Sequence, residues 1–276
     1  MPGERAEDAI GAASELARDR ITTILTHLGE NLARIEEAEE VFHHYARLIE
    51  LIQQAGLDAH VSVKPTQFGY DQDVEVCFDY LSRLLDRAVE ARVFLWIDME
   101  SSPYVDGTLR LYRRLRVRSP TVGVALQAYL YRTEKDLETL IPLGAAIRLV
   151  KGAYLEPASI AYPAKADVDR NYFALAGKLL QVDRMVEGSL VHFGTHDIPL
   201  QEKLRQLIVE RRVPRDRYEF AMLYGIGAAR QRELAAQGVP IRDLISYGEH
   251  WFPWYMRRLA ERPANVWFVV RNLFGG

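Results

Sequence analysis

Residues 93–127 decide the fold, because "VFLWID" (93–98), "DGTLRLYRRLRVR" (106–118) and "VGVALQ" (122–127) follow one another along the chain. The first and third runs are short, apolar and rich in β-branched or aromatic residues, which is typical of buried strands. The run between them is expected to form a helix. Strands that alternate with helices indicate parallel βαβ units.

The same alternation continues on both sides of this unit. Further strands are expected at 20–25, 59–64, 145–151, 189–197, 217–223 and 240–246, and further helices at 36–56 and 73–91. Each strand candidate is followed by a helical segment, and eight such units in about 250 residues is the size of a (β/α)8 barrel. A doubly wound open sheet is the alternative architecture. Without an internal repeat or a linker, we predict one catalytic domain over residues 1–276.

Composition narrows the class of protein. The 276 residues are 49% hydrophobic and 26% charged, as in ordinary globular proteins, and the net charge of −3 gives no sign of nucleic-acid binding. The single cysteine, Cys77, cannot form an internal disulfide, which favours a reducing compartment. No segment resembles a membrane span or a signal peptide. We therefore expect a cytoplasmic protein, and peripheral contact with the inner membrane stays open because amphipathic docking leaves a weak signal.

Polar residues gather at the predicted strand ends, where (β/α)8 barrels carry their active sites. They are Lys64, Asp98, Met99, Gln127, Arg148, Lys151, Thr195, His196, Asp197 and Glu219. For any one of these residues, exposure to solvent at a strand end explains the polar side chain equally well. Their convergence favours a site.

Two motifs leave alternatives open. In "RLVKGAY" (148–154), Arg148 and Lys151 should point to opposite strand faces, unless a turn at Gly152 brings Lys151 over the rim. Lys151 is otherwise a capping lysine. In "HFGTH" (192–196), His192 and His196 have a spacing that a metal could use, but a third ligand is missing, so no metal is expected.

The stretch "WFPWYMRRLAE" (251–261) follows the eighth strand, so it is expected to form a last helix over the barrel mouth. Trp254, Arg257, Arg258 and Glu261 would lie on or beside one helix face. Paired guanidinium groups held by a glutamate match a carboxylate. A surface charge cluster is the alternative.

Seven stretches together resemble the proline dehydrogenase family. They are "HVSVK", "FLWIDMES", "ALQAYLYRT", "RLVKGAYLEP", "GTHD", "YEFAMLYGI" and "MRRLAERPAN", in the family's order from about Leu28 onward. The resemblance implies a distorted (β/α)8 barrel with its last helix on top, and FAD bound non-covalently without a Rossmann domain. The GIGAAR stretch (225–230) likewise lacks the complete GxGxxG pattern of a Rossmann turn.

The resemblance also implies roles for matched positions. Asp98 and Arg148 would surround the reacting atoms. Substrate would contact Lys64, Leu244, Trp254, Arg257, Arg258 and Glu261. FAD would contact Met99, Gln127, Arg148, Lys151, Gly152, Ala153, Thr195 and His196. A cyclic imino acid such as proline would transfer a hydride to FAD and become a pyrroline carboxylate, and a quinone or another acceptor would then take the electrons.

Some positions depart from the family pattern. A tyrosine is usual at Leu244 and at Trp254, and Ala221, Gly227 and Ser246 also differ from the usual residues. These departures keep a second hypothesis open, in which a biosynthetic enzyme oxidises a substituted proline analogue. A Schiff-base aldolase using Lys151 and a non-catalytic ligand-binding homologue are two further alternatives.

Overall fold

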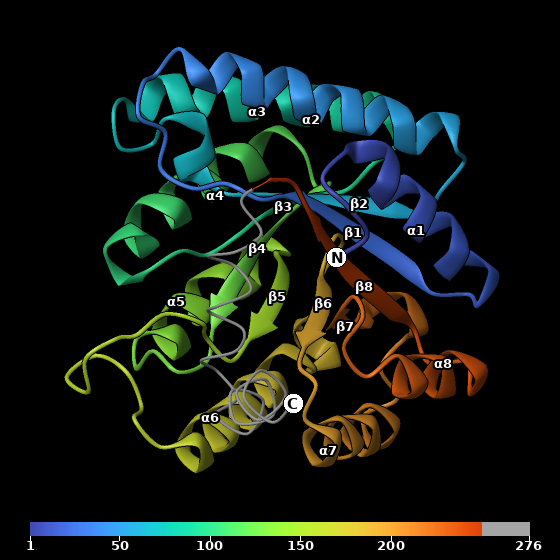
Figure 1. The fold of residues 1–276 in the computed structure, drawn as a ribbon. Coiled ribbons are helices and arrows are strands. Elements are labelled where there is room, and N and C mark those ends of the chain that lie inside the picture. The colour runs from blue at the N-terminus through green and yellow to red at the C-terminus, as the bar shows by residue number, and fades with distance from the viewer. Residues whose placement is uncertain (250–276) are drawn as a thin grey trace, which may run out of the picture.

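Eight parallel strands form a closed barrel in chain order in this computed structural model, which describes residues 1–249 (Figure 1). The strands are β1 (Thr22–His27), β2 (Ala59–Val63), β3 (Leu95–Ile97), β4 (Val122–Gln127), β5 (Ala146–Val150), β6 (Leu190–Gly194), β7 (Tyr218–Leu223) and β8 (Ile241–Tyr247). The barrel prediction is confirmed and the open sheet is wrong, because β8 pairs with β1. β1 begins two residues later than expected.

Helices surround the strands on the outside of the barrel (Figure 1). They are α2 (Glu37–Gln54), α3 (Val74–Ala91), α4 (Val105–Arg118), α5 (Thr133–Leu140), α6 (Lys165–Leu179), α7 (Ile198–Glu210) and α8 (Ala228–Ala236). Short 3-10 helices are η1 (Pro65–Phe68), η2 (Ser102–Tyr104), η3 (Ile141–Leu143), η4 (Val182–Arg184) and η5 (Arg215–Arg217). The expected helices over 36–56, 73–91 and 106–118 are confirmed. Among residues 1–249, none of the helices combines the length and apolar character needed to cross a bilayer.

An additional helix, α1 (Ala6–Arg18), precedes the first strand and was not expected. It packs against β1 and β8, the two strands whose pairing closes the barrel. Its buried face consists of four alanines and Leu16. Its apolar residues recur at helical spacing, so the sequence pattern carries a signal for this helix that the expectations for the first residues did not include.

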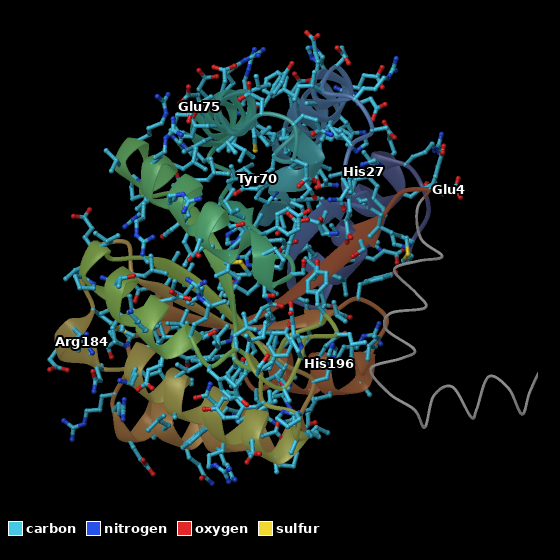
Figure 2. All side chains as sticks on the ribbon, turned by 90° about the vertical axis from the view of Figure 1, so that its left-hand side faces the viewer. Glu4, His27, Tyr70, Glu75, Arg184 and His196 are labelled. Carbon is cyan, nitrogen blue, oxygen red and sulfur yellow. The ribbon has the colours of Figure 1, made fainter. Side chains whose placement is uncertain are left out.

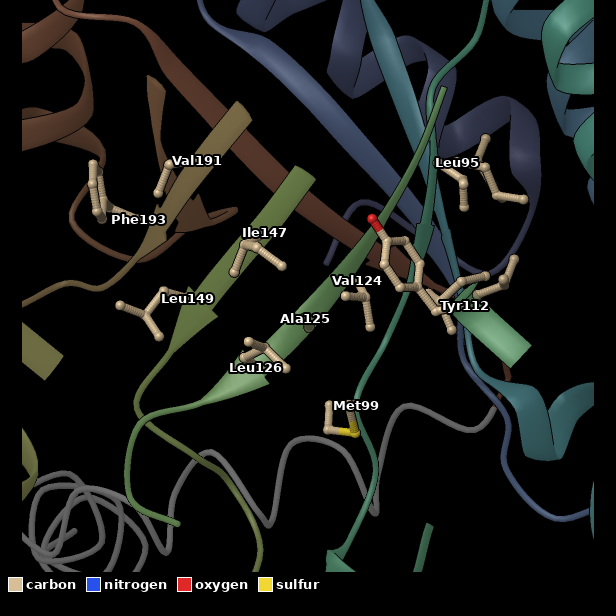
Figure 3. Close-up of a cluster of buried hydrophobic side chains, with 14 of the residues drawn as sticks. Leu95, Met99, Tyr112, Val124, Ala125, Leu126, Ile147, Leu149, Val191 and Phe193 are labelled. Carbon is tan, nitrogen blue, oxygen red and sulfur yellow. The ribbon is translucent and has the colours of Figure 1, made fainter. Parts of the chain in front are cut away.

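The two faces of each strand have different chemistry. The outward side chains of the middle strands are apolar and buried against helices, as Figure 3 shows for Val124, Leu126, Ile147, Leu149, Val191 and Phe193. Burying each such side chain contributes about 1.5–3 kcal/mol. The alternate residues point into the barrel and include Gln127, Arg148 and His192, all buried. The helices thus supply the apolar core, while the barrel interior carries ionisable groups.

Asp243 is an exception to this division, because it points outward from β8 between the inward Arg242 and Leu244. It is fully buried, and neither carboxylate oxygen has a hydrogen-bond partner among residues 1–249. Burial raises the pKa of Asp243 from its ordinary 3.8 to about 7. Between these pH values the unfolded chain releases a proton that the folded chain keeps. Stability from this group is therefore complete below pH 3.8 and is lost as pH rises to about 7.

We expect Asp243→Asn to remove this pH dependence, because an amide has the same shape and no charge. The loss in the wild type is about 1.4 kcal/mol per pH unit within the interval. The variant should therefore unfold at higher urea concentration than the wild type at pH 8, and at nearly the same concentration at pH 4. Asp79→Asn, an exposed aspartate on α3, serves as control. Equal urea midpoints of Asp243→Asn and wild type at pH 8 would contradict the expectation.

Candidate active site

A cavity of about 580 Å³ opens at the carboxyl ends of the strands. Its size is that of sites that hold small molecules or cofactors. The cavity brings together all the site residues predicted within the described part of the chain. They are Lys64, Asp98, Met99, Gln127, Arg148, Lys151, Gly152, Ala153, Thr195, His196 and Leu244. Figure 2 places His196 at the opposite end of the barrel from Arg184, which lies in η4 just before β6.

Arg148 and Asp98 form an ion pair that lines this cavity. Arg148 Nη2 donates to Asp98 Oδ1 and, at 2.9 Å, to Ser62 Oγ, which itself lies 3.0 Å from Asp98 Oδ1. The arginine is 4% exposed, and burial lowers its pKa to about 9. Its Nη1 has no hydrogen-bond partner among the described residues. A buried guanidinium nitrogen without an acceptor fits a ligand that brings an electron-rich atom.

Gln127 is held by the backbone of the neighbouring strand end. Its Nε2 donates to the Glu100 carbonyl oxygen at 2.9 Å. The Glu100 side chain, 3% exposed, accepts from Thr66 N at 3.2 Å and from Thr66 Oγ1 at 2.5 Å. Burial raises the pKa of Glu100 to about 7. These bonds fix the amide of Gln127 beside Asp98 and Met99.

The turn after β5 decides where Lys151 points. Gly152 has φ of +123°, and a Cβ there would lie 2.4 Å from the Tyr129 ring, so only glycine fits. The turn brings Lys151 to the same cavity as Arg148, although the two are three residues apart. The expectation that Gly152 could turn Lys151 over the rim is thus confirmed.

Lys151 belongs to an ion network at the rim that the sequence pattern did not reveal. Its Nζ pairs with Asp169 and lies 3.0 Å from Asp197 Oδ2, and Lys165 Nζ contacts the same two carboxylates. Although burial alone would raise it, hydrogen bonds from the two lysines lower the pKa of Asp197. Two carboxylates thus hold the Nζ atom of Lys151. A Schiff-base nucleophile must be free to attack a carbonyl carbon, so this geometry does not support an aldolase.

Lys64 also has a carboxylate partner that sequence reasoning missed. Its Nζ lies 2.5 Å from Glu30 Oε1, and both residues line the cavity. Glu30 comes from the loop between β1 and α2, three residues after the strand ends. A search extended a few residues beyond the strand ends would have included it.

Two expectations about the histidines and Glu219 need correction. Because β6 ends at Gly194, His196 does not share a strand face with His192; it lies at the mouth and its Nε2 accepts from Leu223 N at 2.9 Å. His192 is fully buried inside the barrel. Glu219, expected at the carboxyl end of β7, is the second residue of that strand and lies at its amino end, 3.0 Å from His192 Nε2. The predicted strand over 217–223 already has Glu219 near its start, so the position at the amino end follows from the sequence.

Four predicted site residues, Trp254, Arg257, Arg258 and Glu261, lie outside the described residues, as does the last helix expected over the mouth. Their roles stay predictions.

A closed (β/α)8 barrel whose mouth holds a cofactor-sized cavity with a buried arginine defines an enzyme-type site. The proline dehydrogenase family model matches residues 9–271. The chain is 36% identical to "Proline dehydrogenase 1" of Bacillus subtilis subsp. natto, covering 99% of this chain and 89% of that protein. It is 37% identical to "Proline dehydrogenase" of Deinococcus radiodurans, covering 100% and 89%. The chain therefore belongs to the proline dehydrogenase family, a family of oxidoreductases.

A solved structure shares the fold. Proline utilization A (PutA) from Bdellovibrio bacteriovorus, inactivated by N-propargylglycine, superposes with a TM-score of 0.85 at 22% identity. The match covers 94% of this chain and 32% of that one. The family match begins at residue 9, whereas the sequence motifs show the resemblance only from about Leu28 onward.

We expect Asp98→Asn to destabilise the protein, because it leaves the buried Arg148 without its counter-ion. Removing one member of a buried ion pair costs about 3 kcal/mol. The measurement is urea unfolding at pH 7. Asp106→Asn is the matched control, since Asp106 pairs with Arg132 on the surface, where ion pairs contribute under about 1 kcal/mol. Equal losses of unfolding free energy in the two variants would show that the buried ion pair of Arg148 stabilises the protein no more than a surface pair does.

Proposed function

We propose that the protein oxidises proline to the corresponding pyrroline carboxylate with FAD as the hydride acceptor. The observation that carries the proposal is the Arg148–Asp98 pair at the cavity, with a buried guanidinium nitrogen that has no acceptor among residues 1–249. Membership of the proline dehydrogenase family supports it. The two other enzyme hypotheses, a substituted proline analogue and an aldolase, are not favoured by these relatives.

The residues that line the cavity fit a flavin. Arg148 offers a positive charge and an Nη1 donor without an acceptor in the described part of the chain, Gln127 an amide, and Gly152 a close approach of the backbone to a ligand. We assign cofactor contacts to Met99, Gln127, Arg148, Lys151, Gly152, Ala153, Thr195 and His196. When bound, FAD supplies the acceptor for the hydride that leaves the proline ring carbon next to nitrogen.

The remaining contribution of the protein is to orient the substrate. The C–H bond breaks with its electron pair, a C=N bond forms, and the nitrogen proton is released to water. Arg257 and Arg258, oriented by Glu261, would hold the substrate carboxylate. Asp98 and Lys64, with Leu244 and Trp254, would place the ring. Such positioning lowers the barrier without any protein nucleophile.

Three further assignments complete the proposal. We propose a quinone or another acceptor for the electrons of reduced FAD. We also propose a cytoplasmic location with peripheral contact with the inner membrane, and one catalytic domain over residues 1–276.

The direct test is to purify the protein and look for flavin. We expect a yellow protein that releases FAD on heat denaturation and loses its flavin absorbance when proline is added without oxygen. Arg148→Ala should fold, as judged by circular dichroism, yet lose most of this reduction rate. A colourless protein that takes up no added FAD would refute the proposal, and trapping by borohydride with a carbonyl substrate would then favour the aldolase.

Substrate choice can be tested at Leu244, which lines the cavity with Ala221 and Ser246, all three smaller than the residues usual in the family. We expect the pocket to tolerate ring-substituted prolines better than ordinary relatives do. Leu244→Tyr should raise the kcat/KM ratio of proline over a 4-substituted proline by roughly tenfold, the scale of discrimination by size in apolar pockets. Leu244→Met, of similar volume, is the control and should leave the ratio unchanged. An unaltered ratio in the tyrosine variant would exclude Leu244 from substrate selection.

A further inference from the structure

Trp96 lies inside the barrel beneath the Arg148 guanidinium. The indole is fully buried, and the Arg148 Cζ atom lies 5.2 Å from its ring centroid. The indole has two further contacts. The ring centroids of Trp96 and His192 are 4.3 Å apart, and Trp96 Nε1 donates to His60 Nδ1 at 3.0 Å. The hydrogen bond fixes the orientation of the indole plane. The indole ring of Trp96 is therefore held against Arg148, which lines the cavity.

The neighbouring strand leaves space for this ring. Gly123 of β4 pairs in register with Trp96 of β3. A Cβ at Gly123 would lie 2.4 Å from Trp96 Cζ3 and 2.6 Å from Cε3, so the backbone itself lies against the indole. Glycine weakens a strand unless something must approach closely. The indole position is thus built into two strands.

The groups below the indole add no positive charge next to it. Burial lowers the pKa of His60 and that of His192; Glu219 acts in the opposite direction on both, while Arg242 and Arg148 lower both further, and each pKa stays below its ordinary value. Burial alone would raise the pKa of Glu219, but its bonds to Arg242 and His192 hold that pKa well below its ordinary value. Arg242 is thereby neutralised at the amino end of the barrel.

This cluster is not a metal site in our interpretation, although single ligand atoms of His60, His192 and Glu219 lie within 4.8 Å of one another. Arg242 Nε and Nη2 occupy both Glu219 oxygens at 2.5 and 2.9 Å. His60 Nδ1 accepts the hydrogen bond of the indole, so the ring proton of neutral His60 lies on Nε2. A metal at Nε2 would require this proton to move to Nδ1, and the hydrogen bond from the indole would then be lost. The histidines act as neutral supports of the ring.

We propose that Trp96 is a positioning residue for Arg148, holding the guanidinium against its aromatic face so that the free Nη1 is directed to the bound cofactor. The inference rests on the proposed function. A desolvated cation over an indole is stabilised by the ring quadrupole. Among residues 1–249, Asp98 is the one carboxylate that pairs with this buried charge. The aromatic face keeps the arginine fixed without neutralising it, and a fixed positive charge favours the reduced, more negative cofactor.

The test compares Trp96→Phe and Trp96→Leu in the FAD-loaded protein. We expect the rate of anaerobic flavin reduction by proline to fall about threefold in Trp96→Phe and about tenfold in Trp96→Leu, with KM for proline unchanged within twofold. The flavin midpoint potential should fall in the same order. A tenfold change in the equilibrium of this two-electron couple corresponds to about 30 mV. A merely structural role would lower stability and leave the potential unchanged.

Phe94→Leu is the matched control. Phe94 lies two residues earlier on the same chain segment, and its ring is 5.1 Å from that of Trp96 and 5.0 Å from that of His60. Its truncation should affect stability but not the potential. If the Trp96 variants do not fold, Gly123→Ala carries the test, because its Cβ must displace the indole while the ring is retained; the potential should again fall.

The outcomes separate the two proposals. A wild type without FAD, or one that proline does not reduce, refutes the proposed function and this inference with it. A wild type that proline reduces, with variants whose potentials stay within 10 mV (roughly a twofold change in the equilibrium) of the wild type, refutes the inference alone.

Discussion

The pairing of β8 with β1 closes the sheet, and the rest of the molecule depends on that closure. Six residues of each strand are in register, from Thr22 with Arg242 to His27 with Tyr247. A closed sheet has no edge, so every strand has one face toward the helices and one toward a confined interior. α1 covers the seam, and its alanine face lets it approach both strands.

Closure has a consequence for charge. The inward positions of β2, β5, β6, β7 and β8 include two arginines, two histidines and a glutamate, which are expensive to bury unless paired. At the amino end of the barrel, Arg242 is paired with Glu219 and Asp58, and Asp58 Oδ1 lies 3.0 Å from Arg242 Nη1. At the carboxyl end, Arg148 has one carboxylate partner within the described part of the chain, and its Nη1 has no hydrogen-bond partner there. The first arginine is saturated and structural, whereas the second retains capacity to bind a ligand.

Much of this arrangement could be predicted from the sequence, and the parts that could not have physical reasons. Strands are short apolar runs separated by helices, so their number and the barrel follow from the pattern. Strand ends lie where Gln127 or Asp98 end an apolar run, so the cavity residues of β2 to β6 could be identified. Pairing partners could not, because Glu30, Asp169 and Ser62 become neighbours of Lys64, Lys151 and Arg148 only after folding. Glu219 was misplaced for a different reason: it lies near the start of the predicted strand 217–223, so the sequence already put it toward the amino end of the barrel.

The interior layers between the two arginines explain why aromatic and neutral groups lie there. Two guanidinium groups inside one narrow barrel repel each other, and any positive charge on the groups between them would add to that repulsion. Trp96 and the two histidines fill this space with rings that are polarisable yet neutral. A chain of aliphatic residues would also be neutral, but it would offer Arg148 no electron-rich face, and the indole hydrogen bond to His60 would be lost. The polar interior thus separates Arg242, which is held by protein carboxylates, from Arg148, which lines the cavity, within a single barrel.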